Sequence, residues 1–168
     1  MIADILRPAA ICTILLLIEI SLVPWISING LTPDLLLIYV MLTAANRGKN
    51  AGLLTGLYAG LLQDITGGGA LGLLALAKCN LAFLLGLSIE KRGNSFAAWV
   101  LLPVVFISAL IHNTWTALFM LQGSEIEFGY FIISDILPSA LYTTFCGLLF
   151  MLTAGKTRKS HRVMNVLR

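Results

Sequence analysis

The sequence predicts an all-α membrane protein with six transmembrane helices and both termini in the cytoplasm. Of the 168 residues, 58% are hydrophobic and only 11% are charged, and the mean hydropathy of +0.93 is far above that of a soluble domain. Every Lys and Arg except Lys78 falls in one of four short patches, with long apolar stretches between them. The patches are Arg7, Arg47/Lys49, Lys91/Arg92 and the tail from residue 156 to residue 168.

The expected spans are the apolar segments between these patches. At roughly 20 residues per span, about six spans with short connections use the whole chain. The second and third are only about 16 residues each, so we expect them to tilt little, thin the bilayer or be partly re-entrant, with five spans or a hairpin as alternatives. We expect one transmembrane domain over residues 1–155 and a basic cytoplasmic tail over 156–168. The segments run approximately over 9–28, 31–46, 50–65, 70–89, 97–121 and 129–154.

The distribution of charge predicts the orientation. Cytoplasmic loops hold Lys and Arg, whereas acidic residues have little effect on insertion. The connections near residues 24–33, 65–70 and 122–130 contain no Lys or Arg, so we expect them to face outward. The tail KTRKSHRVMNVLR carries basic residues and no acid, which favours contact with anionic lipid head groups. Its alternatives are topology determination alone and docking of a cytosolic partner.

Two kinds of residue within the spans have structural interpretations. Pro103 and Pro138 lie inside apolar segments, where a missing backbone donor is expected to bend a helix, whereas Pro8 lies at a span end. The cysteines are odd in number and lack metal-like spacing, so we expect small apolar packing residues and no metal or cofactor. These cysteines are Cys12, Cys79 and Cys146.

A stripe of small residues lies on one face of the third span. In AGLLTGLYAG, Gly52, Gly56 and Gly60 are spaced so that they follow one another along a helix. Another helix can approach such a stripe closely, because backbone packing drives helix association in lipid. The stripe indicates either packing within the six-helix body or contact with another membrane protein.

Four ionisable side chains interrupt the apolar spans at a similar depth. Glu19, Lys78, His112 and Asp135 each lie very roughly 10 to 15 Å below the outer face, taking a rise of about 1.5 Å per residue. Intramembrane charges normally face the protein interior and pair, which suggests an ion pair between Glu19 and Lys78. The layer either locks the helices together or lines an outward-facing polar pocket for a ligand. Polar or aromatic residues near it are Asn80, Asn113 and Trp115.

The sequence gives little support for catalysis. His112 has no nucleophile at helical spacing, and there is no His-Glu-x-x-His motif. Asp64 is a single carboxylate beside glycines, and no Gly-Lys-Ser/Thr follows the glycines at 67–69. We therefore expect a protein that is not an enzyme.

Two segments resemble a known family. The stretch from Gly52 to Lys78, GLLTGLYAGLLQDITGGGALGLLALAK, resembles the rod shape-determining protein MreD family, whose members pair a glycine-striped helix with a Gln/Asp-containing turn and a small-residue loop. PDLLLIYV, which opens the second span, is similar to the same family's pattern. The motif maps onto Pro33, Asp34, Gly56, Gly60, Gln63, Asp64, Gly68, Gly69, Leu71, Gly72 and Lys78.

The resemblance implies a non-enzymatic scaffold of the cell-wall elongation complex in the bacterial inner membrane. Its implied partners are MreC, the MreB cytoskeleton and, directly or through MreC, RodA with a class B penicillin-binding transpeptidase. Asp34 and Asp64 are expected near outer span ends, where a carboxylate reaches water or accepts backbone N–H bonds at a helix start. The residues implied in partner contact or helix packing are Gly52, Gly56, Gly60, Pro33, Asp34, Gln63, Asp64, Gly68 and Gly69.

The family is also similar in fold to the substrate-binding S components of energy-coupling-factor transporters, which are six-helix bundles. This similarity implies an alternative function, a small-molecule-binding subunit of a membrane transporter. S components tend to show an Ala-x-x-x-Ala surface in their first span. The first span here reads ICTILLLIEISLV and lacks that surface, which weakens the alternative.

Overall fold

The structure is a computed structural model, and it describes residues 2–28, 30–67, 70–91, 98–120 and 128–150. These residues form six helices and no strand, which confirms the all-helical prediction. The sixth, here called the last helix, starts as α6, passes through the π-helical turn η2 and stays helical over 137–150. The elements are α1 (Ile2–Ser21), the 3-10 turn η1 (Val23–Ile26), α2 (Leu35–Arg47), α3 (Lys49–Gly67), α4 (Leu73–Lys91), α5 (Ala98–Met120), α6 (Phe128–Phe131) and η2 (Ile132–Ile136).

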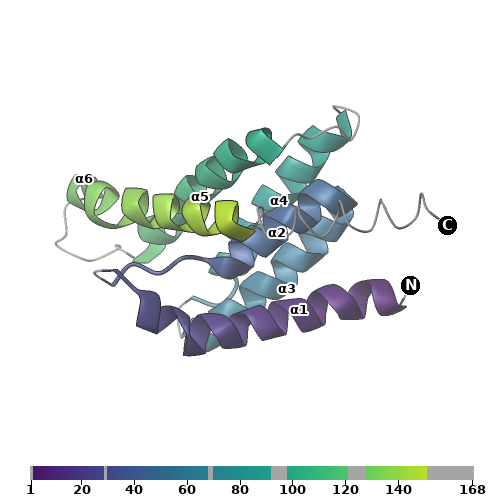
Figure 1. Ribbon diagram of the computed structural model, residues 1–168, viewed down its shortest axis with the longest axis horizontal. Coiled ribbons are helices and arrows are strands. Elements are labelled where there is room, and N and C mark those ends of the chain that lie inside the picture. The colour runs from purple at the N-terminus through teal and green to yellow at the C-terminus, as the bar shows by residue number, and fades with distance from the viewer. Residues whose placement is uncertain (1, 29, 68–69, 92–97, 121–127, 151–168) are drawn as a thin grey trace.

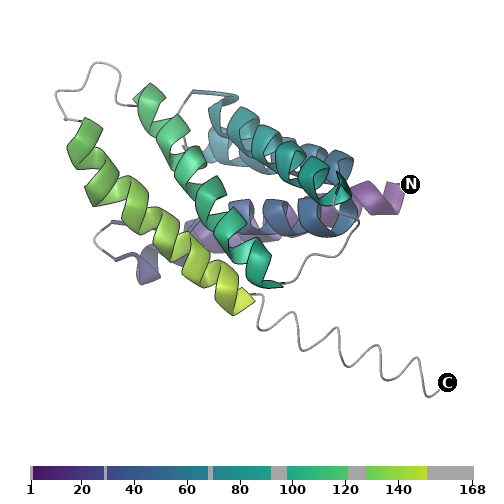
Figure 2. The ribbon, with the colours of Figure 1, turned by 90° about the horizontal axis from the view of Figure 1, so that it is seen from above.

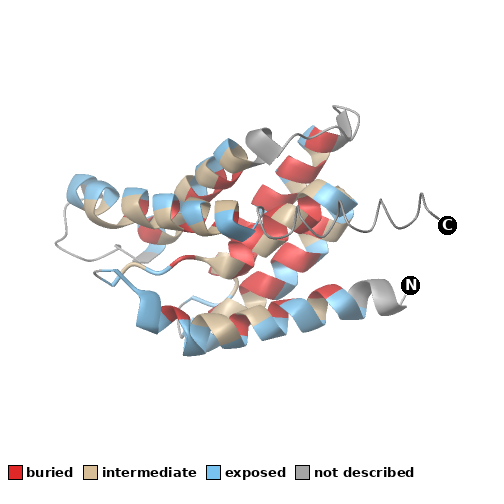
Figure 3. Ribbon diagram, in the orientation of Figure 1, coloured by how far each residue is buried: buried red, intermediate tan, exposed pale blue. Residues whose placement is uncertain are grey.

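Helices α2, α3 and α4 form the centre of the molecule (Figure 1). The α3–α4 contact is the most extensive, and α2 packs on both helices. Helix α1 lies against α2 and α3. Helix α5 packs on α4 and α2, and the last helix lies beside α5 (Figure 2). Buried residues accordingly concentrate on α2, α3 and α4, and α1 and the last helix expose much of their surfaces (Figure 3).

Two of the described helices are long and apolar enough to cross a membrane, over Leu102–Phe119 and Gly129–Phe150. Two further apolar helices, Leu35–Arg47 and Leu73–Ile89, are shorter. The last helix exposes a stripe of large apolar side chains one turn apart, which is rare on a soluble monomer. The stripe consists of Ile133, Leu137, Leu141, Phe145 and Leu149.

The helix bounds differ from the expected spans in three places. Helix α1 begins at Ile2 rather than near residue 9 and ends at Ser21 rather than near residue 28, so Pro8 lies inside it. Helix α3 has 19 residues and is longer than expected, whereas α2 has only 13. Hydropathy marks where side chains are apolar, whereas helix ends depend on caps and breakers such as Pro24, which explains these differences.

The two prolines expected to bend spans both lie inside helices. Pro103 is within α5, and Pro138 is the second residue after the π turn. Pro138 has no N–H to donate to the carbonyl of Ser134 one turn earlier, and its ring crowds that carbonyl. The adjoining turn is wider, with the Leu137 N–H bonded to the Ile132 carbonyl five residues back.

The glycine stripe of α3 is covered inside the molecule. A Cβ atom at Gly52 would lie 2.5 Å from the Cβ of Ala44 on α2, and one at Gly56 would lie 2.9 Å from the carbonyl oxygen of Lys78 on α4. A Cβ atom at Gly60 would overlap the backbone of Ala75. The structure therefore places the stripe in packing within the chain, the first of the two alternatives.

Candidate polar site

A polar network of buried and half-buried side chains joins five of the helices to Asp34, the N-cap residue of α2. Its members lie far apart in the chain, yet hydrogen bonds, one salt bridge and a 3.5 Å contact of His112 with Asp34 link them around the start of α2. We call this set the polar network throughout. It consists of Glu19 (α1), Asp34 (α2), Gln63 (α3), Lys78 (α4), His112 (α5) and Thr143 (last helix).

Asp34 is the centre of the polar network. It caps the N-terminus of α2, where its Oδ1 accepts a 2.7 Å hydrogen bond from the backbone N–H of Leu37. Its Oδ2 forms a salt bridge with the Lys78 ammonium and lies 3.5 Å from Nε2 of His112. Its own backbone N–H donates to Oγ1 of Thr143 at 3.2 Å. One residue thus connects α2 with α4, α5 and the last helix.

Gln63 bridges the two carboxylates of the polar network. Its Nε2 donates to Oε1 of Glu19 at 2.6 Å and lies 3.5 Å from Oδ1 of Asp34. The other oxygen of Glu19 accepts from the backbone N–H of Leu36 at 3.4 Å. Both carboxylates therefore lie at the start of α2, where unpaired N–H groups and the helix dipole favour negative charge.

Lys78 pairs with Asp34 instead of the expected Glu19. The Lys78 side chain is 0% exposed, and no salt bridge joins it to Glu19 among the described residues. The prediction was wrong about the partner because it placed Asp34 at a span end near water. Helix α2 is only 13 residues long, about 20 Å, and its N-cap residue Asp34 lies beside Lys78 in the second turn of α4. A fully buried ammonium requires such a partner.

Asp135 does not join the other three residues of the predicted layer. It lies in the π turn of the last helix, where its Oδ2 accepts a 2.8 Å hydrogen bond from the Ser134 hydroxyl. Asn113 donates to the Ile136 carbonyl at 3.4 Å and so ties α5 to the last helix. Of the other side chains expected near a pocket, Asn80 is exposed and Trp115 stacks at an angle on Phe119. The predicted layer is therefore divided: Glu19, Lys78 and His112 belong to the polar network, and Asp135 lies apart from it.

Asp64 caps the next helix along the chain. One of its oxygens accepts from the backbone N–H groups of Gly72 at 2.9 Å and Ala75 at 3.2 Å, and the other accepts from Leu74 at 3.0 Å. Gly72 adopts a positive φ of 94° in the turn that brings these groups to the carboxylate. This is the helix-start role that the sequence suggested for an aspartate here. The adjacent residues Gln63 and Asp64 therefore act at the starts of two different helices, Gln63 at α2 and Asp64 at α4.

Two polar atoms of the network are buried without a hydrogen-bond partner in the described part of the chain. They are Oε1 of Gln63 and Nδ1 of His112. With Nε2 of His112 turned toward Asp34, a neutral imidazole leaves Nδ1 as an acceptor. The described residues contain no group of three or more His, Cys, Asp or Glu side chains placed to hold a metal ion.

Sequence reasoning missed Thr143, and it did not connect Asp34 and Gln63 with the intramembrane charges. A threonine in an apolar span carries no distinguishing pattern, so only the fold shows that Thr143 is a member. Asp34 and Gln63 were grouped with the packing residues, although they join Glu19 and Lys78 in the polar network. The motif residues Gly68 and Gly69, and the tail over 156–168, lie outside the described residues.

Comparison with protein families gives a match. A family model described as rod shape-determining protein MreD matches residues 4–156, a range that contains the whole polar network and both helix-capping aspartates. Comparison with curated proteins and with solved structures gives no match. The matched family consists of bacterial membrane proteins that determine rod shape. Since the match covers most of the 168 residues, the chain belongs to the MreD family of rod shape-determining proteins.

Proposed function

We propose that the protein is a non-enzymatic scaffold of the bacterial cell-wall elongation complex. In this proposal it crosses the inner membrane six times, with both termini in the cytoplasm. Its partners are MreC, the MreB cytoskeleton and, directly or through MreC, RodA with a class B penicillin-binding transpeptidase. The observation that carries the proposal is the family match over residues 4–156.

The polar network supports a scaffold because its charged side chains Glu19, Asp34 and Lys78 are engaged in contacts between helices. Lys78 is paired with Asp34, and Glu19 is held by Gln63 and by a backbone N–H. Buried ionic groups of this kind add specificity of arrangement more than net stability. Such a network fixes how six helices are arranged, which a scaffold needs in order to present defined outer faces.

The packing of α3 limits where a membrane partner can bind. Helix α4 and the end of α2 already cover the glycine stripe, so another protein cannot use it without unpacking the centre. The outer faces of α1 and the last helix remain accessible, with large apolar side chains such as Leu17 and Leu141 exposed. We place the partner contacts on these outer faces.

Co-purification tests the proposed partners. The tagged protein is extracted from native membranes in mild detergent, and the retained proteins are identified by mass spectrometry. Recovery of MreC together with RodA supports the scaffold. Recovery of ATPase coupling subunits, or of a bound metabolite without MreC, contradicts it and favours the transporter subunit.

Reporter fusions test the proposed topology separately. A reporter that is active only in the cytoplasm is fused to either terminus, and a second reporter, active only outside, is placed in the loop after Trp25. We expect activity from both termini and from the loop. Termini on opposite sides would show an odd number of spans.

A further inference from the structure

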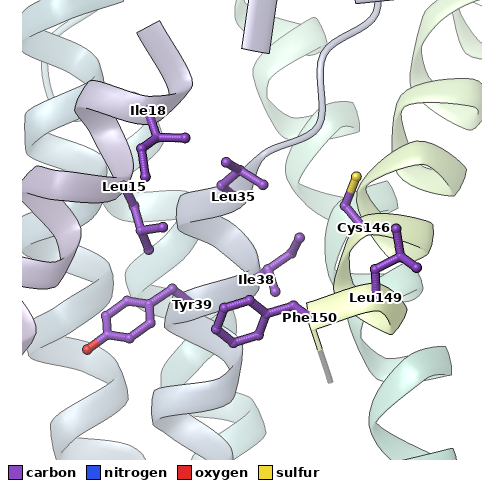
Figure 4. Close-up of a pocket in the computed structure, with 8 residues that line it drawn as sticks. All are labelled: Leu15, Ile18, Leu35, Ile38, Tyr39, Cys146, Leu149 and Phe150. Atoms are coloured by element: carbon purple, nitrogen blue, oxygen red, sulfur yellow. The ribbon is translucent and has the colours of Figure 1, made fainter. Parts of the chain in front are cut away.

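An apolar cavity of about 370 Å³ lies between α1, α2 and the last helix. In Figure 4, side chains of α1 such as Leu15 and side chains of the last helix such as Phe150 lie on either side of α2. Ile38 and Tyr39 of α2 also line the cavity. The lining is almost wholly hydrocarbon, and Phe150 is about half exposed at its edge. The cavity can therefore take an apolar chain that enters from the lipid side.

Two arginines flank one end of this cavity. Helices α1 and α2 run in opposite directions, so the start of α1 and the end of α2 lie at the same end of the molecule (Figure 1). Arg7 precedes Leu15 on α1, and Arg47 follows Tyr39 on α2, each by about two helical turns or about 12 Å. Both arginines are exposed. Two positive charges therefore lie beyond this end of the apolar cavity, about two helical turns from its lining residues.

We propose that the cavity holds an acyl chain of an anionic phospholipid whose head group lies between Arg7 and Arg47. Basic pockets between transmembrane helices on the cytoplasmic side bind such head groups. This inference rests on the proposed placement in the membrane, because it puts both arginines at the cytoplasmic surface. The apolar lining gives no preference among lipids, since lipid tails are as apolar as leucine. The preference for an anionic over a neutral lipid comes from the arginines, each of which raises the binding constant about fivefold.

The charge at this end favours a lipid over a transmembrane helix of another protein. The cytoplasmic flank of a membrane helix is normally rich in Lys and Arg. A partner helix seated along the cavity would bring like charge against Arg7 and Arg47. A phospholipid brings a phosphate to the same position, so its charge is complementary.

Native mass spectrometry of the purified protein tests the head-group preference. The protein in detergent is titrated with phosphatidylglycerol and with phosphatidylcholine of the same acyl chains. We expect the wild-type protein to bind phosphatidylglycerol at least tenfold more tightly. The double variant Arg7→Gln/Arg47→Gln changes only exposed side chains, and we expect it to bind the two lipids about equally. Equal binding by the wild-type protein overturns the proposal.

A matched pair of tryptophan variants tests the cavity itself. Leu15→Trp fills the cavity from α1, whereas Leu17→Trp places the same ring on the same helix at a side chain that is 59% exposed and does not line the cavity. We expect Leu15→Trp to retain one lipid fewer than the wild type and Leu17→Trp to retain the same number. Equal retention by the two variants contradicts the proposal.

Photocrosslinking in native membranes distinguishes the lipid from a protein occupant. With p-benzoylphenylalanine in place of Leu15, we expect crosslinks to lipid. A crosslink to a protein overturns the assignment of an acyl chain. The scaffold proposal is judged by recovery of MreC and the lipid proposal by bound mass and crosslinks, so each can fail while the other holds.

Discussion

The α2–α3–α4 centre and the outer pair, formed by α5 and the last helix, differ in how their side chains pack. In the centre, small residues such as Gly56 let backbones touch, and a fully buried Lys78 is neutralised within the protein. In the outer pair, large apolar side chains such as Ile107 and Leu141 are exposed. Among the described helices, those long and apolar enough to span a membrane are the outer pair, and the centre contains the short α2. Close backbone contacts and a buried ion pair therefore distinguish the centre, whose core also contains large apolar side chains such as Leu36.

The largest difference between the two regions is expected from glycine substitutions. Gly60→Ala places a methyl group in the backbone of Ala75, and neither helix can yield without separating α3 from α4. We expect little or no folded protein by size-exclusion chromatography in detergent. Gly129→Ala is the matched control in the last helix, because no atom lies within 4 Å of its added Cβ. Equal yields from the two variants would show that α3 and α4 are not in backbone contact.

The next largest effect is expected from the salt bridge in the centre. Lys78→Met leaves the Asp34 carboxylate buried without its cation, which costs about 3 to 5 kcal/mol in such cases. We expect a marked fall in the thermal unfolding midpoint in detergent. The double variant Asp34→Asn/Lys78→Met removes both charges and should recover part of the loss. In contrast, Glu19→Gln/Lys78→Met should recover nothing, and recovery there would reinstate Glu19 as the partner.

A moderate effect is expected from the cap of α4. Asp64→Ala removes the acceptor of three backbone N–H groups at the start of this helix, and loss of a cap costs about 0.5 to 2 kcal/mol. We expect hydrogen exchange to accelerate over residues 72–75 with the remaining helices unchanged. Asp135→Asn is the control in the outer pair, where the carboxylate has a side-chain partner in Ser134. Faster exchange spread over all helices would mean that Asp64 has a wider role than capping.

The smallest effect is expected on the lipid-facing surface. Leu141→Ala removes an exposed side chain of the last helix, and lipid replaces the lost contacts at little cost. We expect a change in unfolding free energy within about 0.5 kcal/mol, as for surface substitutions generally. A loss comparable to that of Lys78→Met would place Leu141 in a packed interface and remove the contrast between the two regions.

The sequence was sufficient to predict the helical class, the approximate segments and most of the residues that matter. Hydropathy locates apolar helices, and intramembrane charges such as Glu19 and Lys78 are conspicuous against them. The pairing of Lys78 could not be predicted, because it depends on how deep the first turn of α2 lies. Thr143 could not be found at all, since its hydroxyl matters only through the backbone N–H of Asp34. The motif included Gln63 and Asp64, but it did not predict that Gln63 binds the carboxylates at the start of α2 and that Asp64 caps α4.

The polar network also constrains the order of events during synthesis. Asp34 leaves the ribosome 44 residues before Lys78 and 109 residues before Thr143. At roughly 5 to 20 residues per second, this carboxylate waits about 2 to 9 s for its cation. During that wait, the short α2 carries an unpaired charge that favours the water boundary over the lipid interior. With the proposed membrane topology, we expect helix α2 to take its final depth only after α4 has been made, and the network to be complete only when the last helix emerges.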